Sequence, residues 1–214
     1  ERSDFRIVNY ELRIIKNSDF NDIPVGITFK IEYKGSVVPV RLAGALGFAQ
    51  AYSAAAATAV GLCLGVNMVE ASEALSNNYT PPPGRLRLLK GNKNSLILDD
   101  SYNASPESMR LALDTLRDIP AKRKIAVLGD MLEIGKYTEQ AHRAVGRQAA
   151  EFVDLLFTVG ARAKFIADEV RLNLASQNLA EFDDSISAGR ALDYLIKEGD
   201  LILVKGSQSM RMEE

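Results

Sequence analysis

The sequence predicts an α/β protein in two parts, a strand hairpin with helices followed by a domain built on a mostly parallel sheet. Three observations predict this class: four short apolar runs that do not alternate, helical patterns between them, and a proline-rich segment ahead of them. Such runs are typical of strands buried on both faces, and alternating strands and helices imply parallel pairing with right-handed crossovers. The expected strands lie at 95–99, 124–128, 154–159 and 201–204, and the expected helices at about 106–117, 138–152, 161–174 and 186–198.

The N-terminal part has a different pattern. Residues 5–16 and 25–41 are rich in β-branched and aromatic residues with rough alternation, and "YKGS" within the second stretch suits a hairpin turn. The alanine-rich stretch 49–65 predicts a helix that packs closely, and Asn67 can cap a second, shorter helix.

A linker is expected at residues 76–85, "SNNYTPPPGR". This segment combines turn formers with consecutive prolines, which cannot continue a helix. We therefore expect one domain over residues 1–80 and another over residues 81–214.

Composition narrows the class of protein. The formal net charge is −2 and no block of Lys and Arg stands out, which argues against binding to nucleic acid or to a membrane surface. The single cysteine, Cys63, cannot form an intrachain disulfide and is expected to be a buried thiol. No apolar run is long enough for a membrane span, and the first residues lack the pattern of a signal peptide. Without an initiator Met, the chain is expected to be a piece of a longer protein.

The stretch "LILDDSYNASPESM" ends an apolar strand in two carboxylates, Asp99 and Asp100. Parallel sheets bind ligands at the carboxyl ends of their strands, where a carboxylate can accept hydrogen bonds from ribose hydroxyls. A role for both residues in the turn and in capping explains the pattern equally well. Ser105, followed by proline, can cap the next helix.

Other strand ends carry similar residues. "VLGDMLEIG" offers Asp130 and Glu133, "FTVGARAK" uses Gly160 to enter a helix, and "LVKGSQSMRME" offers Lys205 and Ser207. A cation with hydroxyls and a glycine can hold an anionic group. Each segment alone is more typical of an ordinary loop, but all of them are expected at one edge of the sheet.

Several kinds of site are not indicated. His142 lies on a predicted helix, where an isolated histidine is more often a capping or packing residue than a catalyst. Cys and His have no spacing typical of metal ligands, so no metal site is predicted. The chain contains neither GxxxxGK[ST] nor GxGxxG, so a loop that grips a triphosphate is not expected within it.

Together these motifs resemble the C-terminal part of the Mur ligases. The resemblance rests on "LILDDSYNASPESM", "VLGDMLEIG", the Glu139-x-x-His142 pair and "LVKGSQSMRME", in this order, and runs from about Pro39 to the last residue. It implies that residues 1–80 are the end of the family's central ATP-binding domain and that residues 81–214 form its Rossmann-like C-terminal domain.

The resemblance is to the members that join D-alanyl-D-alanine to UDP-MurNAc-tripeptide. It implies an ATP-dependent amide ligase of peptidoglycan synthesis that works through an acyl phosphate, in the cytoplasm and as a monomer. ATP and Mg²⁺ are the implied cofactors, with the metal ligands and the phosphate loop upstream, so that this chain alone is expected to be inactive. Two alternatives stay open: a Mur-type ligase for another amino acid, and a non-catalytic module that binds a nucleotide.

Site residues follow from the resemblance, although it assigns no catalytic residue within the chain. It implies that ATP is bound by Arg85, Asp100, Asn103 and Ser53, and that substrate is bound by Asp130, Glu133, Lys205 and Ser207.

The chain departs from the family pattern in the alanine-rich helix. The family histidine is replaced by Ala49, and the asparagine expected to touch adenine is Ser53, with Gln50 as another candidate. In the last motif the common arginine is Gln208, which removes a cation.

Overall fold

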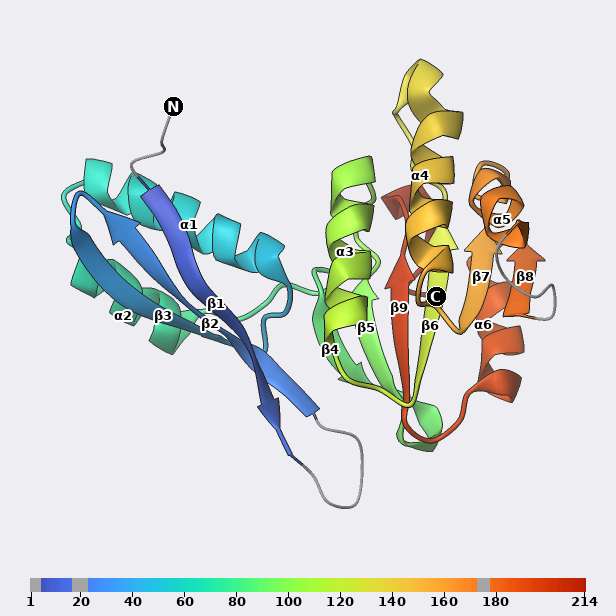
Figure 1. The fold of residues 1–214 in the computed structure, drawn as a ribbon, viewed down its shortest axis with the longest axis horizontal. Coiled ribbons are helices and arrows are strands. Elements are labelled where there is room, and N and C mark those ends of the chain that lie inside the picture. Colours follow the sequence, from blue (N-terminus) through green and yellow to red (C-terminus); the bar gives the residue numbers. More distant parts are fainter. Residues whose placement is uncertain (1–4, 17–22, 173–177) are drawn as a thin grey trace. The chain divides into compact units, whose positions relative to one another are not determined.

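The computed structural model describes residues 5–16, 23–172 and 178–214. Its described residues form two compact units, the first ending at Pro81 and the second beginning at Pro82. Each unit has its own sheet (Figure 1).

Unit 1 is an antiparallel three-stranded sheet with two helices. Its strands pair in the order β1-β2-β3, and the turn between β2 and β3 falls at Lys34 and Gly35, as "YKGS" predicts. Every second residue of β3, from Val38 to Leu42, points into a core that α1 closes with Ala51 and Ala54. The elements are β1 (Phe5–Ile15), β2 (Ile23–Tyr33), β3 (Ser36–Ala43), α1 (Phe48–Cys63) and α2 (Met68–Asn78).

Local sequence patterns predict only part of where the helices of this unit begin and end. The Asn67 side chain accepts hydrogen bonds from the backbone N–H groups of Val69 and Glu70, so the predicted cap of α2 is confirmed. Because α2 continues to Asn78, the linker is shorter than the sequence indicates. The expectation of a buried Cys63 is wrong: this residue ends α1 and is exposed.

Unit 2 is a six-stranded sheet with the order β4-β5-β9-β6-β7-β8, in which β4 is antiparallel and all other pairs are parallel. This confirms the α/β class with a mostly parallel sheet. The elements are β4 (Arg87–Lys90), η1 (Asn92–Asn94), β5 (Leu96–Asp100), α3 (Pro106–Asp118), β6 (Arg123–Gly129), η2 (Gly135–Tyr137), α4 (Thr138–Ala150), β7 (Leu155–Val159), α5 (Lys164–Arg171), β8 (Leu179–Phe182), α6 (Ser185–Leu195), β9 (Asp200–Lys205) and η4 (Gln208–Met210).

Helices cover both faces of this sheet. The neighbouring helices α3, α4 and α5 lie over one face (Figure 1), and α6 packs through Ala188 against Ile125, Phe157 and Ile202 on the other. The last strand, β9, inserts between β5 and β6, so three strand ends with polar motifs become neighbours.

The two edge strands of the six-stranded sheet, β4 and β8, were not predicted from the sequence. Both β4 and β8 have only four residues, too few to show a periodic pattern. The helix α5 begins later than predicted because residues 161–163 form a turn, and the last two residues of the predicted helix 161–174 lie outside the described part of the chain.

Candidate functional site

A cleft of about 700 Å³ opens at the carboxyl edge of the parallel sheet in unit 2. It is lined by the loops that follow β5, β6 and β9, which are neighbours in the sheet. Of the predicted site residues, the cleft brings together Asn103, Glu133 and Ser207, and Gln208 lies beside them. Ser105 also lines it, although the sequence indicated only its role as a helix cap.

Asp100 and Lys205 form a buried ion pair where β5 and β9 end. The parallel register places the two residues opposite each other, and Lys205 Nζ lies 2.6 Å from Asp100 Oδ2. The lysine also donates to the backbone carbonyl of Asn103, at 2.8 Å. Burial raises the pKa of Asp100 and lowers the pKa of Lys205, and each charge opposes the shift of the other. Lys205 therefore ties the loop after β5 to the neighbouring strand, and its contact with substrate stays a prediction.

The segment that enters unit 2 is fastened to the loop after β5. The Gly84 N–H donates to Asp99 Oδ2 at 3.1 Å, and the Leu86 N–H donates to Asp100 Oδ1 at 3.1 Å. The Tyr102 N–H donates back to the Gly84 carbonyl at 3.2 Å. Gly84 has a φ of 68°, and a Cβ there would lie 2.9 Å from the Tyr102 nitrogen, so the position suits only glycine. The two segments form one structural element.

Arg85 and Asn103 are exposed polar residues of this element, and Asp99 shapes its turn. The Arg85 guanidinium lies over the Tyr102 ring, 4.2 Å from the centroid. Asp99 Oδ1 accepts hydrogen bonds from the N–H (3.2 Å) and the hydroxyl (2.6 Å) of Ser101. Asp99 thus has the turn role that the sequence left open for it. Asn103 is exposed, and its Oδ1 accepts from the following backbone N–H at 2.8 Å. Arg85 and Asn103 therefore present polar groups to solvent from the element that also holds Asp100.

Asp130 and Glu133 have different environments in the loop after β6. Asp130 is 5% exposed, and its Oδ1 accepts from the N–H groups of Arg162 (2.9 Å) and Ala163 (2.7 Å). A Cβ at Gly160 would lie 2.7 Å from this oxygen, so the glycine makes room for the carboxylate. Asp130 thus holds the turn that starts α5, and its contact with substrate stays a prediction. Glu133 is exposed, has a φ of 63° and lines the cleft.

Two buried side chains hold the same loop. The Ser207 hydroxyl accepts from the Leu132 N–H at 2.8 Å, and the Ser207 N–H donates to the Asp130 carbonyl at 2.9 Å. His142 is fully buried, and its Nε2 accepts from the Met131 N–H at 3.0 Å. The packing role expected for His142 is confirmed, but no pattern in the sequence indicates that this residue reaches the loop after β6.

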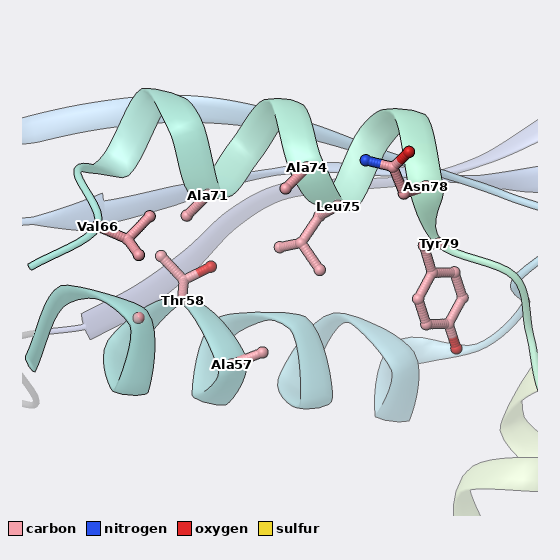
Figure 2. A pocket seen from close by; sticks show the side chains of 9 residues that line it. Ala57, Thr58, Val66, Ala71, Ala74, Leu75, Asn78 and Tyr79 are labelled. Carbon is pink, nitrogen blue, oxygen red and sulfur yellow. The ribbon is translucent and has the colours of Figure 1, made fainter. Parts of the chain in front are cut away.

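The residues considered for adenine lie on α1 in unit 1. The Ser53 hydroxyl donates to the Ala49 carbonyl at 3.2 Å, and Gln50 Oε1 accepts from the Tyr79 hydroxyl at 2.6 Å. Tyr79 stands at one end of an open groove of about 380 Å³ between α1 and α2, lined mainly by small apolar side chains (Figure 2). A contact of Ser53 with adenine stays a prediction.

Within residues 5–16, 23–172 and 178–214, no group of three or more His, Cys, Asp or Glu side chains is placed to hold a metal ion. In the same part of the chain, the helices are too short or too polar to cross a lipid bilayer.

The sequence matches the family described as Mur ligase, glutamate ligase domain, over residues 84–208. It is 32% identical over 171 residues to the UDP-N-acetylmuramoyl-tripeptide–D-alanyl-D-alanine ligase of Bacillus subtilis, and the match covers 79% of this chain and 37% of that protein. It is 37% identical over 165 residues to the same ligase of Escherichia coli, and this match covers 76% of this chain and 35% of that protein. The chain therefore spans little more than a third of these relatives.

Solved structures with this fold include MurF from Acinetobacter baumannii, with a TM-score of 0.79 and 30% identity over 100% of this chain and 44% of that one. MurF from Thermotoga maritima in complex with ADP has a TM-score of 0.75 and 26% identity, with 100% and 45% covered.

Proposed function

The chain belongs to the Mur ligase family, and we propose that it is the C-terminal part of an ATP-dependent ligase that joins D-alanyl-D-alanine to UDP-MurNAc-tripeptide. In this reaction the terminal carboxylate of the tripeptide becomes an acyl phosphate, the amine of the dipeptide attacks it, and phosphate leaves. Relatives that carry out this ligation in peptidoglycan synthesis share about a third of their residues with this chain over the matched part. The reaction belongs in the cytoplasm, since it uses ATP and a UDP-linked substrate.

The observation that carries the proposal is the cleft formed by the three motif-bearing loops. Amide formation needs an oriented amine next to an activated carboxyl group, in a site from which water is excluded. The exposed carboxylate of Glu133 suits the ammonium group of a dipeptide, and the polar groups of Ser207 and Gln208 suit its carboxylate. The cleft therefore offers a charged partner for the ammonium group of a dipeptide and neutral hydrogen-bonding groups for its carboxylate.

The element around Asp100 fits a nucleotide. Arg85 offers an exposed cation for phosphate, and Asn103 offers an exposed amide. Each carboxylate oxygen has about two lone pairs, so Asp100 can accept ribose hydroxyls while it keeps its bonds to Lys205 and the Leu86 N–H. We assign these residues to ATP. ATP supplies the phosphoryl group that activates the carboxyl. We assign the Mg²⁺ ligands to the part of the relatives' length that this chain does not span.

Unit 1 is proposed to be the end of the central ATP-binding domain. On α1 the apolar side chains of Tyr52 and Val60 are 61% and 59% exposed, and that of Leu64, directly after the helix, is 79% exposed. Large apolar side chains exposed along one helix are typical of a surface that packs against further protein. Because the relatives are longer than this chain, we infer that the covering surface belongs to another part of the same polypeptide.

The test uses the natural gene product that contains this chain. Phosphate release from ATP is measured with UDP-MurNAc-tripeptide and either D-alanyl-D-alanine or single amino acids. Release that depends on the dipeptide supports the proposal, and release with a single amino acid instead would make the protein another Mur-type ligase. A product that binds ADP but releases no phosphate with any acceptor would be the non-catalytic module.

A further inference from the structure

The imidazole of His142 is a fully buried titratable group that the proposed reaction does not use. Its Nε2 accepts from the Met131 N–H at 3.0 Å, and its Nδ1 lies 2.7 Å from the Thr138 carbonyl oxygen. A ring nitrogen that accepts from an N–H carries no proton, and a nitrogen that faces a carbonyl must donate one. The network therefore assigns one neutral tautomer, with the proton on Nδ1.

The loop after β6 is held through three consecutive backbone N–H groups. The N–H of Asp130 donates to the Val159 carbonyl at 3.1 Å, the N–H of Met131 donates to His142, and the N–H of Leu132 donates to the Ser207 hydroxyl. The acceptors come from β7, from α4 and from the loop after β9. Three other segments therefore hold the loop up to Leu132, the first of its residues to line the cleft.

The next residue, Glu133, has a φ of 63°, which is unfavourable for a residue with a side chain. Such a conformation persists where the surrounding structure holds it. Leu132, Glu133 and Ile134 all line the cleft, so the direction of the Glu133 carboxylate depends on the anchors that precede it.

We propose that His142 is a positioning residue of the cleft: its neutral ring holds the Met131 backbone and thereby orients Glu133 toward the amine of the incoming substrate. The role in substrate binding rests on the proposed function, whereas the role in holding the loop does not. The charged groups that act on the ring are Asp130, which favours its protonation, and Arg162, which opposes it.

Two variants of the natural gene product that contains this chain separate positioning from mere packing. His142→Gln places an amide oxygen near the position of Nε2 and keeps an acceptor for Met131. His142→Asn places an amide near the position of Nδ1, keeps a donor for Thr138 and removes the acceptor. Both side chains are smaller than histidine and neutral, so a role in packing alone makes Asn only slightly worse than Gln.

The readouts are hydrogen exchange of the Met131 and Leu132 amides and the affinity for D-alanyl-D-alanine, both measured by NMR, with thermal melting to confirm folding. We expect His142→Asn to speed exchange of Met131 and to weaken dipeptide binding, each by roughly two- to tenfold, the effect of one hydrogen bond. His142→Gln is expected to stay within about twofold of the wild type in both.

Equal behaviour of the two variants, or unchanged exchange of Met131 in His142→Asn, would overturn the positioning role. If the wild-type protein binds no D-alanyl-D-alanine, the assignment of the cleft to the dipeptide fails, and the exchange rates still decide whether His142 holds the loop. If exchange changes but dipeptide affinity does not, His142 holds the loop without serving binding, and the proposal is overturned in that part.

Discussion

Replacing Lys205 by methionine tests the buried ion pair that joins β5 to β9. Methionine keeps most of the volume and removes the charge, so that Asp100, whose side chain is 10% exposed, loses its cation and the Asn103 carbonyl loses its donor. Removing one partner of a buried pair costs about 3–5 kcal/mol, because the other charge stays buried without compensation. For a unit of this size, that loss corresponds to a fall in melting temperature of roughly 10–20 °C.

The assay is urea unfolding followed through backbone amide signals of unit 2, with Lys122→Met as the matched control. Lys122 is exposed, and its replacement is expected to change the free energy of unfolding by no more than about 0.5 kcal/mol. The double variant Lys205→Met with Asp100→Asn removes both charges and is expected to recover much of the loss. A Lys205→Met chain within about 1 kcal/mol of the wild type, or a double variant less stable than the single one, would refute the reasoning.

The pH dependence of this loss has a definite sign. Burial raises the pKa of Asp100, and in the Lys205→Met chain no ammonium opposes the shift. The stability associated with the protonated carboxyl is fully present below the ordinary pKa of about 3.9 and is lost as the pH rises through the raised value. The variant is therefore expected to approach wild-type stability in acid.

Three further predictions concern other residues. Burial lowers the pKa of His142, so the stability that its neutral ring contributes is present above about pH 6.5 and is lost as the pH falls through the lowered value; His142→Gln should flatten this part of a stability–pH curve. Gly160→Ala should destabilise unit 2 by about 1–3 kcal/mol in thermal or urea unfolding, because Gly160 has a φ of 103° and the added Cβ would collide with Asp130 Oδ1. Gly189→Ala, at a helical position with open space around it, should instead stabilise unit 2 by about 0.5–1 kcal/mol. The opposite order of stabilities would contradict the geometry. Cys63 is exposed, so the rate at which a thiol reagent labels the folded chain should be within about tenfold of the rate in the urea-unfolded chain. A much slower reaction in the folded chain would show that the residue is covered.

Local sequence signals were sufficient for much of the fold. Asn67 and Ser105 cap the helices that follow them, because a side chain can reach the free N–H groups of its own helix without help from the rest of the protein. The apolar runs at 124–128 and 201–204 indicated buried strands, since strands covered on both faces cannot tolerate polar residues there. By contrast, the exposure of Cys63 depends on what packs over α1, which no local pattern records.

The α/β class, the succession of strands and helices, and the polar motifs at the ends of strands can be predicted from the sequence alone. How those motifs combine depends on tertiary contacts, because β9 enters the sheet between two strands that precede it by many residues. That insertion brings Lys205 to Asn103, 102 residues away in the chain, and opposite Asp100. It also decides that Glu133 and Ser207 face the cleft while Asp130 faces the start of α5. Side-chain direction follows from strand register and loop anchoring, which are set by contacts between distant segments rather than by neighbours in the sequence.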